Sequence, residues 1–456
     1  MSVNSMSSTI ISKANIAVNR FGYGARGDEF ESAKKDPEAW IKSQLLPISF
    51  NSSLPHSNDI FNSHAKYQKQ KKQLKKQQQS KKQSMSKMTK NLPRTVLVNM
   101  ATDTLNQAIH SSHSVSWRLL DFFSNHFSVS ANGRLMTGLS GTLEREAIAP
   151  NLLGNFEELL LAVEQHPAML IYLNNEKSFG PNSRMAKKNK KGLNENLARE
   201  IMELHTLGVN GGYTQADVIE LAKGITGWSV KNPRRERSAG FVFRDYGHEP
   251  GQRTLLGKSY RQKGIIQGKQ MLRDLAMHPA TAKYVCAKLA HHFVSETPSA
   301  SLLSKMEVTW LKNQGNIKQV MLTLFEADES WLTTAQKYKT PREFVISTFR
   351  ALGQKRINEQ ALFQSLITLG QQPFNAGSPA GYSDDVKDWF GASALMARID
   401  WSTMMSGYRK RINAEKMIKI AFSDNVSKHT YQSVMRAESR PQAMTLLLMS
   451  PEFQRR

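Results

Sequence analysis

The chain has 456 residues, 39% of them hydrophobic, a mean hydropathy of −0.48 and ordinary numbers of Gly (27) and Pro (16). These values exclude a chain that is disordered overall and fit a soluble globular protein of two or three domains, or one large helical domain with an appendage. The formal net charge of +24 would attract anionic polymers and surfaces without any specific contact.

Cys286 is the only cysteine, which excludes an internal disulfide framework and a Cys-rich metal site. It lies among apolar residues at a helical position, which indicates a buried, unreactive thiol. No apolar run approaches the ~18 residues that a membrane helix needs. The stretch 1–20 lacks the charged start and continuous apolar core of a secretory signal, so the sequence as written predicts a cytoplasmic protein without a transmembrane segment.

Eleven of the positive charges lie between Lys66 and Arg94, in a Lys/Gln-rich stretch without Asp or Glu. Such a run is typical of a solvated helix or a flexible loop, or of an arm that binds nucleic acid or anionic lipid. Tyr67 is its only aromatic residue, which is few for stacking on bases. We therefore expect a flexible, solvated insertion.

Hydrophobic residues at three- and four-residue spacing predict helices along most of the chain. In order, the expected helical segments are 14–21, 28–46, 95–110, 116–127, 144–149, 156–165, 167–172, 265–277, 279–294, 299–313, 317–327, 341–352, 359–369 and the part from 392 onward. Phe241 and Phe243, followed by Thr254 and Leu256 across a Gly/Pro-rich turn, predict one short β-hairpin at about 241–256. Residues 371–385 are irregular, with aromatic and proline anchors.

The expected fold class is therefore mainly α, a multi-helical globular protein with one hairpin. We divide the chain into an N-terminal helical segment (1–65), the basic insertion (66–94), a central helical domain (95–375) and a C-terminal helical segment packed on the same body (376–456).

The stretch 194–228 concentrates Asn, Arg, Glu and His, and its pattern is helix, glycine turn, helix. Thr214 and Asp217 predict a capping box, and Gly208 a left-handed residue that ends the first helix. At about 100° per residue, Asn196, Arg199, Glu200 and Glu203 share one stripe of the first helix. His205 falls on the opposite, apolar side.

Several runs together resemble a bacterial family known as domain of unknown function 1800. They are NENLARE, ELHTLGV, GGYTQADV and ELAKGITGW in 194–228, then HFSVS (126–130), GNFEELLLAVEQHPAML (154–170), HEPGQRTLLG, HPATAKYVCAKLAHHFV and the final SPEFQRR. Their order and spacing agree from about Ala14 onward. The resemblance implies no established activity. It also implies that many members of the family are exported. The partner that it implies is a protein of a companion family, which is related to sulfatases and phosphatases.

The chain departs from the family's pattern in places. The hairpin turn, often His-Asp-x-Gly-x-Lys in the family, here reads HEPGQR, with Glu249 in place of the shorter acid. The family alternates between an ELHTLG form and a QLFTIG form, so Glu203 and His205 are less general than Arg199 and Glu200. The Lys/Gln-rich run has no counterpart in the family's pattern.

Glu200 and Glu203, one helical turn apart, would share a metal or divide acid and base roles, with Arg199 as their electrostatic partner. The alternative is a set of ion pairs and caps that joins helices. Asn194 and Asn196, at the helix start, would suit an anionic or sugar ligand.

The remaining candidates are spread along the chain. His248, a candidate catalytic residue, and Glu249, a candidate ligand-binding residue, lie at the expected hairpin tip, where functional residues often collect. Trp228 lines either a pocket or the core. His126 and His205 are either metal ligands or hydrogen-bonded core residues, and their spacing matches no standard metal motif.

Two interpretations stay open. The first, which we favour, is a hydrolase or lyase that acts on a polysaccharide or other cell-envelope polymer by acid–base or metal-assisted chemistry, with a divalent metal as the conceivable cofactor. The second is a non-catalytic binding or scaffold protein whose basic segments hold an acidic protein, glycan or nucleic acid.

Overall fold

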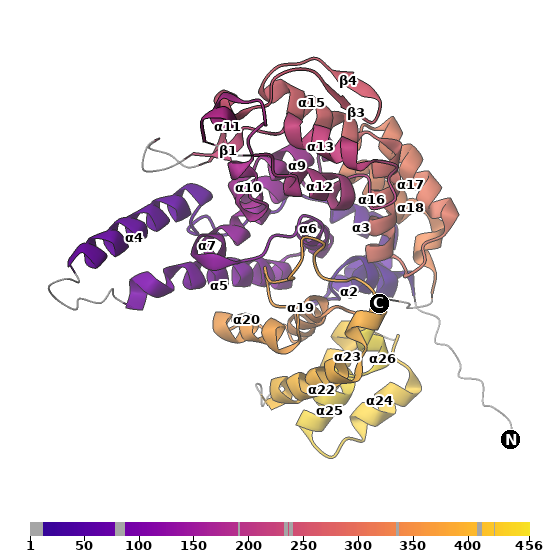
Figure 1. Cartoon of the computed structure of the whole chain (residues 1–456). Coiled ribbons are helices and arrows are strands. Elements are labelled where there is room, and N and C mark those ends of the chain that lie inside the picture. Colours follow the sequence, from indigo (N-terminus) through magenta and orange to yellow (C-terminus); the bar gives the residue numbers. More distant parts are fainter. Residues whose placement is uncertain are drawn as a thin grey trace.

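The computed structural model describes residues 12–77, 87–189, 192–231, 236, 240–333, 337–407, 413–423 and 425–456. The protein is mainly helical, as the sequence predicts, and its few strands are short (Figure 1). Most buried apolar side chains from Ala14 to Phe453 belong to one continuous core cluster, and Leu97, Val98, Ala101 and Phe363 form a small second cluster. None of the described helices is long and apolar enough to cross a membrane.

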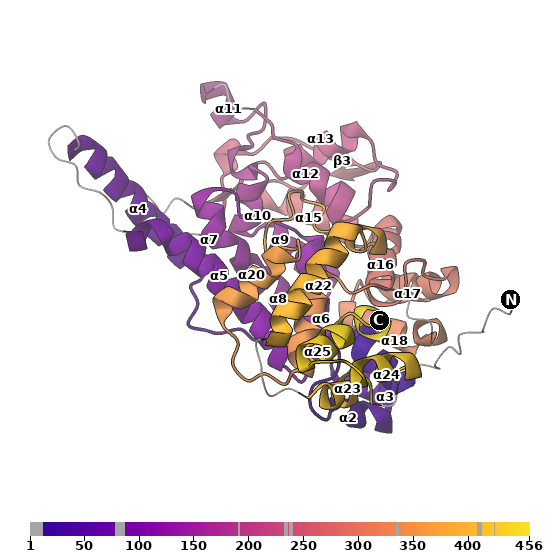
Figure 2. The same cartoon turned by 90° about the horizontal axis from the view of Figure 1, so that it is seen from below.

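The N-terminal part contains a long helical projection. Its elements are α1 (Lys13–Asn15), the π-helix η1 (Ile16–Phe21), α2 (Glu29–Lys35), α3 (Pro37–Ser43), α4 (Ser57–Gln77), α5 (Lys87–His110), α6 (Ser114–His126) and α7 (Gly133–Leu143). Helices α4 and α5 both pack on α7 and extend from the body (Figures 1 and 2). They carry residues 66–77 and 87–94 of the Lys/Gln-rich stretch as helix, while 78–86 lie outside the described residues.

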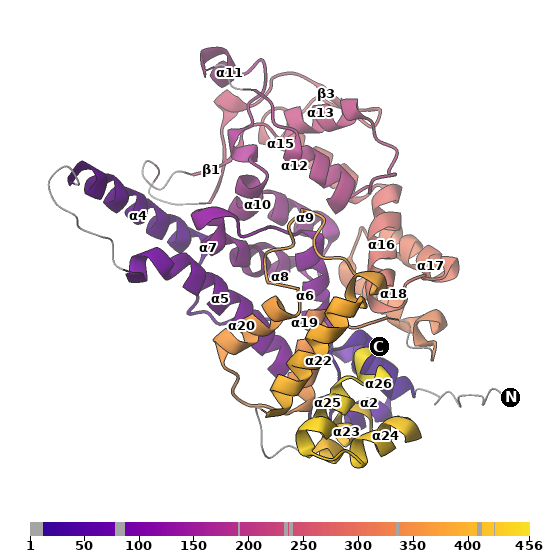
Figure 3. The ribbon, with the colours of Figure 1, turned by 60° about the horizontal axis from the view of Figure 1, so that its bottom comes forward.

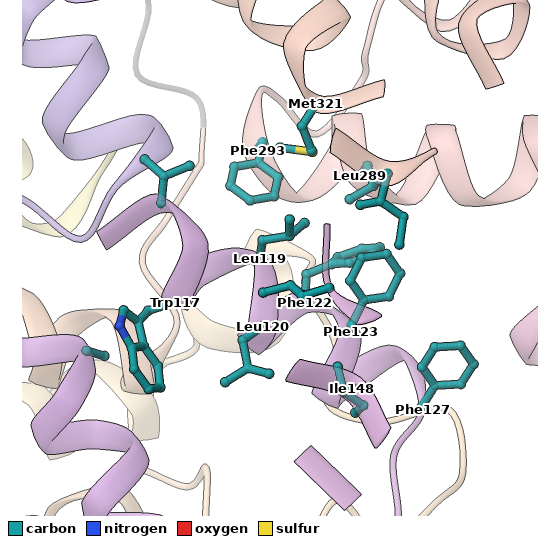
Figure 4. Close-up of a cluster of buried hydrophobic side chains, with 14 of the residues drawn as sticks. Trp117, Leu119, Leu120, Phe122, Phe123, Phe127, Ile148, Leu289, Phe293 and Met321 are labelled. Carbon is teal, nitrogen blue, oxygen red and sulfur yellow. The ribbon is translucent and has the colours of Figure 1, made fainter. Parts of the chain in front are cut away.

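Helix α6 lies inside the core, with nearly all of its residues buried. Leu119, Phe122 and Phe123 on α6 face the side chains of Leu289 and Phe293 on the helix α16 (Pro279–Phe293) (Figure 4). Burial of one such side chain contributes about 1.5–3 kcal/mol. The position of α6 is therefore strongly fixed, which matters because its last turn lines the candidate site.

In the middle of the chain, two helices continue as π-helical turns. The elements are η2 (Glu144–Ile148, a π-helix), α8 (Ala149–Asn151), α9 (Phe156–Glu164), α10 (Pro167–Tyr172), η3 (Asn175–Lys177), α11 (Arg184–Asn189), α12 (Asn196–Glu200), η4 (Ile201–His205, a π-helix) and α13 (Gln215–Gly224). Helix α13 begins with the expected capping box of Thr214 and Asp217. Gly208 has the expected left-handed backbone, with φ of +81°.

The strands pair differently from the expected hairpin, although a short hairpin is present. Strand β2 (Phe241–Phe243) pairs antiparallel with β1 (Trp228–Val230), in the register Trp228 to Phe243. Strand β3 (Arg253–Leu255) pairs with β4 (Lys258–Tyr260). Leu256 and Gly257 between them both have positive φ, which a two-residue type I′ turn requires. Alternation of apolar residues identified the strands but not their partners, so the pairing of 241–243 with 254–256 was wrong.

The short helix η5 (Asp245–Gly247) precedes β3, and after β4 the rest of the chain is mainly helical. Its elements are α15 (Ile265–Ala276), α16, α17 (Ala300–Lys312), α18 (Ile317–Glu326), η6 (Asp328–Trp331), α19 (Pro341–Ala351), α20 (Glu359–Thr368), α21 (Val386–Trp389), α22 (Ala392–Gly407), α23 (Ala414–Phe422), α24 (Lys428–Met435), α25 (Arg440–Leu448) and α26 (Pro451–Gln454). Helices α22–α26 gather at one end of the molecule (Figures 1 and 3). Cys286 is buried in α16, and burial raises the pKa of its thiol, as expected of an unreactive cysteine.

Candidate functional site

A cavity of about 580 Å³ lies between α6, α16 and the irregular segment 371–385. This volume is within the range of pockets that hold small molecules. Charged and imidazole groups from all three elements line it: His126 and Asp121 from α6, Lys288, His291 and His292 from α16, and Asp384 and Asp385 from the irregular segment.

The segment 371–385 is fixed against α6 by a reciprocal hydrogen-bonded pair. Asn125 Nδ2 donates to the Tyr382 carbonyl oxygen at 2.8 Å, and the Tyr382 N–H donates to Asn125 Oδ1 at 2.7 Å. Gly381 has φ of +80°, and a Cβ there would lie 2.4 Å from the Asn125 carbonyl oxygen. The Ala131 N–H also donates to the Phe374 carbonyl oxygen at 2.8 Å. This wall of the cavity is thus an ordered part of the fold.

Lys288 and His126 form a hydrogen-bonded pair in the cavity, with 3.1 Å between Nζ and His126 Nδ1. The other imidazole nitrogen, Nε2, lies 3.1 Å from the His205 carbonyl oxygen. A carbonyl only accepts hydrogen bonds, so Nε2 carries the proton, and Nδ1 accepts from the Lys288 amine.

Both members of this pair are biased toward the neutral state. Burial lowers the pKa of Lys288 to about 8, against the opposing charge of Asp384. Burial and the Lys288 charge lower the pKa of His126 well below its ordinary value. No carboxylate lies within 4.0 Å of Lys288 Nζ among the residues that the structure describes. A minor part of Lys288, about one tenth at pH 7, is therefore a free amine near neutral pH.

Asp384 is the fixed anion of the cavity. Its Oδ2 lies 3.0 Å from His292 Nδ1, 3.6 Å from His291 Nδ1 and 3.6 Å from the buried Lys337 Nζ. Burial would raise the pKa of Asp384, but His292, His291 and Lys337 outweigh burial and hold the pKa well below its ordinary value. The carboxylate therefore stays ionised at neutral pH.

Two buried ion-pair groups beneath the cavity join α6 to α19. Arg342 Nε lies 2.5 Å from Asp121 Oδ1, and the hydroxyl of Tyr23 donates to Asp121 at 2.9 Å. Glu343, the next residue, pairs with Arg118 of α6 at 3.0 Å. These contacts hold the cavity-lining helices in register.

Of the residues predicted from the sequence, His126 lines the cavity and His205 lies directly behind it. The two imidazole rings are 6.1 Å apart, and His205 Nδ1 lies 2.8 Å from the buried Glu164 carboxylate. No third His, Cys or acidic residue in the described part of the chain joins His126 and His205 in a group with metal-ligand spacing.

Glu200 and Glu203 do not line the cavity and lie one layer behind it. Tyr284, which does line the cavity, has its pKa raised by burial and by the charge of Glu203, and its ring packs over Gly208. Burial raises the pKa of Glu200, with His205 opposing and Glu203 adding to the shift. The helix formed by α12 and η4 therefore influences the cavity only indirectly, through Tyr284.

Arg199 joins α12 to α13 rather than facing the cavity. Its Nη2 donates to Glu195 at 3.1 Å and to Gln215 at 2.9 Å, and Gln215 also donates to Glu195 at 2.7 Å. Asn194 Oδ1 accepts from the Asn196 N–H at 2.9 Å, which starts the helix, and Asn196 is exposed.

His248, Glu249 and Trp228 lie together in another part of the fold. His248 Nδ1 donates to the Thr226 carbonyl oxygen at 3.0 Å. Glu249 is buried and accepts from the N–H and the side-chain amide of Asn182, at 2.8 and 2.7 Å. Trp228 is buried completely. All three have structural contacts here, and none lines the cavity.

Most cavity residues were not among the predicted ones. The signals available were the His-His pair at the end of α16, the Asp-Asp pair in the irregular segment, and Thr340-Pro-Arg-Glu343, which is a capping box with proline at the first helical position. Each signal is common in helical proteins, and only the folded chain brings them to one cavity.

The comparisons place nearly the whole chain in one family. A family model described as "Protein of unknown function (DUF1800)" matches residues 16–455, as the resemblance in the sequence indicates. No curated protein and no solved structure matches the chain.

Proposed function

The chain belongs to the DUF1800 family, and we propose that it is an acid–base enzyme, a hydrolase or lyase, with its active site in the cavity between α6, α16 and 371–385. The observation that carries the proposal is the Lys288–His126 pair: a cavity-lining amine, hydrogen-bonded to a neutral imidazole and partly unprotonated near pH 7. A base with a pKa close to the working pH is what proton abstraction requires.

Lys288 is the catalytic base in this proposal. It removes a proton from a water that attacks the substrate, or from a carbon of the substrate, and returns the proton to the leaving group. His126 is a positioning residue, because its Nδ1 orients the amine through the 3.1 Å hydrogen bond. Asp384, held ionised, stabilises positive charge that develops on Lys288 or on the substrate.

The substrate class we propose is a polysaccharide or another cell-envelope polymer. Tyr284, Tyr382 and Phe374 offer aromatic surface, while Gln371 carries a side-chain amide. Aromatic faces pack against the apolar faces of sugar rings, and amides hydrogen-bond to hydroxyls. The cavity volume is sufficient for a small part of such a polymer.

The state of the amine can be tested without a substrate. Each lysine would be acylated at a series of pH values with an amine-selective reagent and quantified by peptide mass spectrometry. The Lys288 profile should have its midpoint near pH 8, whereas a model lysine peptide acylated in the same series should have its midpoint near the ordinary lysine value of about 10.4. Coincident midpoints would remove the basis of the proposal.

Activity is the second test. Wild type, Lys288→Met and the matched control Lys283→Met would be incubated with neutral polysaccharides, uronate polymers and peptidoglycan, with release of reducing ends or unsaturated products as the readout. We expect turnover of at least one polymer, a loss of about 10²–10⁴-fold in Lys288→Met and none in the control. Full activity in Lys288→Met would refute the assignment, and turnover of none of these polymers would refute the substrate class.

A second candidate function is the docking of an anionic partner on the projecting helices. Lys66, Lys69, Lys71 and Lys72 of α4 are exposed, and the stretch from Lys66 to Arg94 contains no acidic residue. A site of this kind is compatible with the enzyme, since it lies on a separate projection (Figure 2).

A further inference from the structure

Three potential metal ligands converge at the edge of the cavity. His291 Nε2 lies 3.3 Å from Asp385 Oδ1 and 3.7 Å from Glu296 Oε2. The three atoms all lie within 4.8 Å of one another, and no other His, Cys or acidic side chains in the described parts of the chain form such a group of three or more.

These spacings match those around a bound metal ion better than those of direct hydrogen bonds. Two ligands at about 2.0–2.2 Å from a tetrahedral ion are separated by roughly 3.3–3.6 Å. A charge-assisted hydrogen bond between nitrogen and carboxylate would instead be about 2.7–2.9 Å long. The imidazole nitrogen thus faces two carboxylate oxygens with space for an ion between them.

The neighbouring groups orient the three ligands. The other nitrogen of His291, Nδ1, faces Asp384 Oδ2 at 3.6 Å, in the order carboxylate, imidazole, ion that is common in metal sites. The buried Lys337 Nζ holds Glu296 Oε1 at 2.6 Å and donates to the Asp384 carbonyl oxygen at 2.6 Å. Lys337 thereby leaves Glu296 Oε2 facing His291 and fixes the backbone next to Asp385.

The ligands come from ordered elements and are accessible to an ion. His291 lies in the last turn of α16, Glu296 follows that helix, and Asp385 precedes α21. Their side chains are 24%, 31% and 42% exposed. The remaining contacts are the Val386 N–H, which donates to Glu296 Oε2 at 3.3 Å, and the exposed Lys387, 3.3 Å from Asp385 Oδ2. Neither contact occupies the space between the three ligand atoms.

We propose that His291, Glu296 and Asp385 bind one first-row divalent metal ion of the Zn²⁺ class, at the edge of the cavity that contains Lys288. An imidazole ligand disfavours Mg²⁺ and Ca²⁺, which prefer oxygen ligands alone. One imidazole and two carboxylates provide three protein ligands, and a fourth position remains for water or substrate, as in catalytic zinc sites.

The position of the ion relative to Lys288 gives it a catalytic role, which rests on the proposed function. Lys288 and His291 are three residues apart on α16, so their Cβ atoms lie roughly 5–6 Å apart on one face of the helix, and both side chains line the cavity. The ion would polarise a bound water or a substrate oxygen, and Lys288 would accept the proton. Metal binding itself does not depend on that role.

The test measures binding and does not use activity. The full chain would be treated with a chelator and titrated calorimetrically with Zn²⁺, Co²⁺, Mg²⁺ and Ca²⁺, with the visible absorption of Co²⁺ as a second readout. We expect one Zn²⁺ or Co²⁺ per chain, a Co²⁺ spectrum of a four- or five-coordinate site, and at least about 10-fold weaker Mg²⁺ and Ca²⁺ binding.

His291→Ala, Glu296→Gln and Asp385→Asn should each weaken Zn²⁺ binding by at least about 10-fold. The matched controls His429→Ala and Asp400→Asn change exposed residues elsewhere and should bind as the wild type does, as should Lys288→Met. Absence of stoichiometric binding, or binding that survives in the three ligand variants while their melting temperatures are unchanged, would overturn the proposal. Because the lysine acylation profile is measured without metal, failure of the metal site leaves the assignment of Lys288 separately testable.

Discussion

Glu343 in α19 and Arg118 in α6 form a buried ion pair, with 3.0 Å between Glu343 Oε1 and Arg118 Nη2. Arg456 joins the same carboxylate at 2.9 Å and donates to the His292 carbonyl oxygen at 2.8 Å. The Glu343 carboxylate therefore connects α19 with α6 and, through Arg456, connects both helices with His292, which is adjacent to His291.

The Glu343 carboxylate makes stability depend on acid pH. Burial would raise its pKa, but Arg456 and Arg118 outweigh burial and lower the pKa from 4.5 to about 2. The unfolded chain therefore takes up this proton at a higher pH than the folded chain. Its contribution, about 3 kcal/mol, is complete above pH 4.5 and is lost as the pH falls toward 2.

Glu343→Gln should lower the free energy of unfolding at pH 7 by about 3–5 kcal/mol, because two buried guanidinium groups lose their counter-ion. Urea unfolding of wild type and variant from pH 7 to pH 2.5 measures both effects. The variant should show a smaller loss of stability between pH 4.5 and 2.5 than the wild type. Parallel pH curves would contradict the assignment of this acid-dependent stability to Glu343.

Lys288 should destabilise the fold below pH 8. The unfolded chain holds this proton up to a pKa of 10.5, whereas the folded chain releases it near 8. Stability therefore rises with pH between about 8 and 10.5 on account of this group. Lys288→Met should raise the free energy of unfolding at pH 7 by about 1–3 kcal/mol, measured by urea unfolding. Destabilisation of this variant at pH 7, with no change in Lys283→Met, would contradict the expected cost of the buried amine.

Glu249 should be a structural residue. Its buried carboxylate accepts two hydrogen bonds from Asn182, and truncation of the side chain removes both bonds and leaves space at a buried position. Glu249→Ala should cost about 2–3 kcal/mol of stability and speed amide hydrogen exchange at 180–183, while the acylation profile of Lys288 stays unchanged. A loss of ligand binding or activity at wild-type stability would restore the ligand-binding interpretation of this residue.

The exposed lysines of α4 should bind anionic polymers in a salt-dependent way. A variant with Lys66, Lys69, Lys71 and Lys72 changed to Gln should bind duplex DNA or heparin more weakly. For DNA, the slope of log affinity against log salt should fall by up to about 0.9 for each lysine that contacts phosphate. The matched control replaces the exposed Lys35, Lys283, Lys312 and Lys355, with the same change in net charge. Equal losses in both variants would show a general charge effect in place of a site on α4.

Much of the fold was predictable because local sequence determines helices. Apolar spacing gave α6, α9, α10 and the helices from α15 to α20 within a few residues, and Thr214, Asp217 and Gly208 gave the ends of two further helices. It did not give α7 or α11, and α5 begins eight residues before its predicted start. The π-helical turn η4 was not predictable from apolar spacing, although it changes where Glu203 and His205 lie on the helix. The strand pairing was also predicted wrongly, because the partner of β2 is β1, which precedes it in the chain.

The candidate site was less predictable than the fold. His126 was identified, but Lys288 and Asp384 were not, because an isolated lysine or aspartate in a sequence is ordinarily a solvated surface residue. What distinguishes them is burial and the charge of their neighbours, which is Asp384 for Lys288 and mainly His292 for Asp384. Both arise only when α6, α16 and the segment 371–385 come together. The density of charge in 194–228 reflects contacts such as those of Arg199 with Glu195 and Gln215.

The reciprocal hydrogen bonds between Asn125 and Tyr382 join residues 257 positions apart in the chain. Contacts of such long range have a high loop-closure entropy and form late in folding. During synthesis, α6 and α16 emerge well before the wall that completes the cavity. The charged groups that line the cavity therefore meet only when most of the chain has been made, and the cavity is expected to be among the last parts of the molecule to assemble.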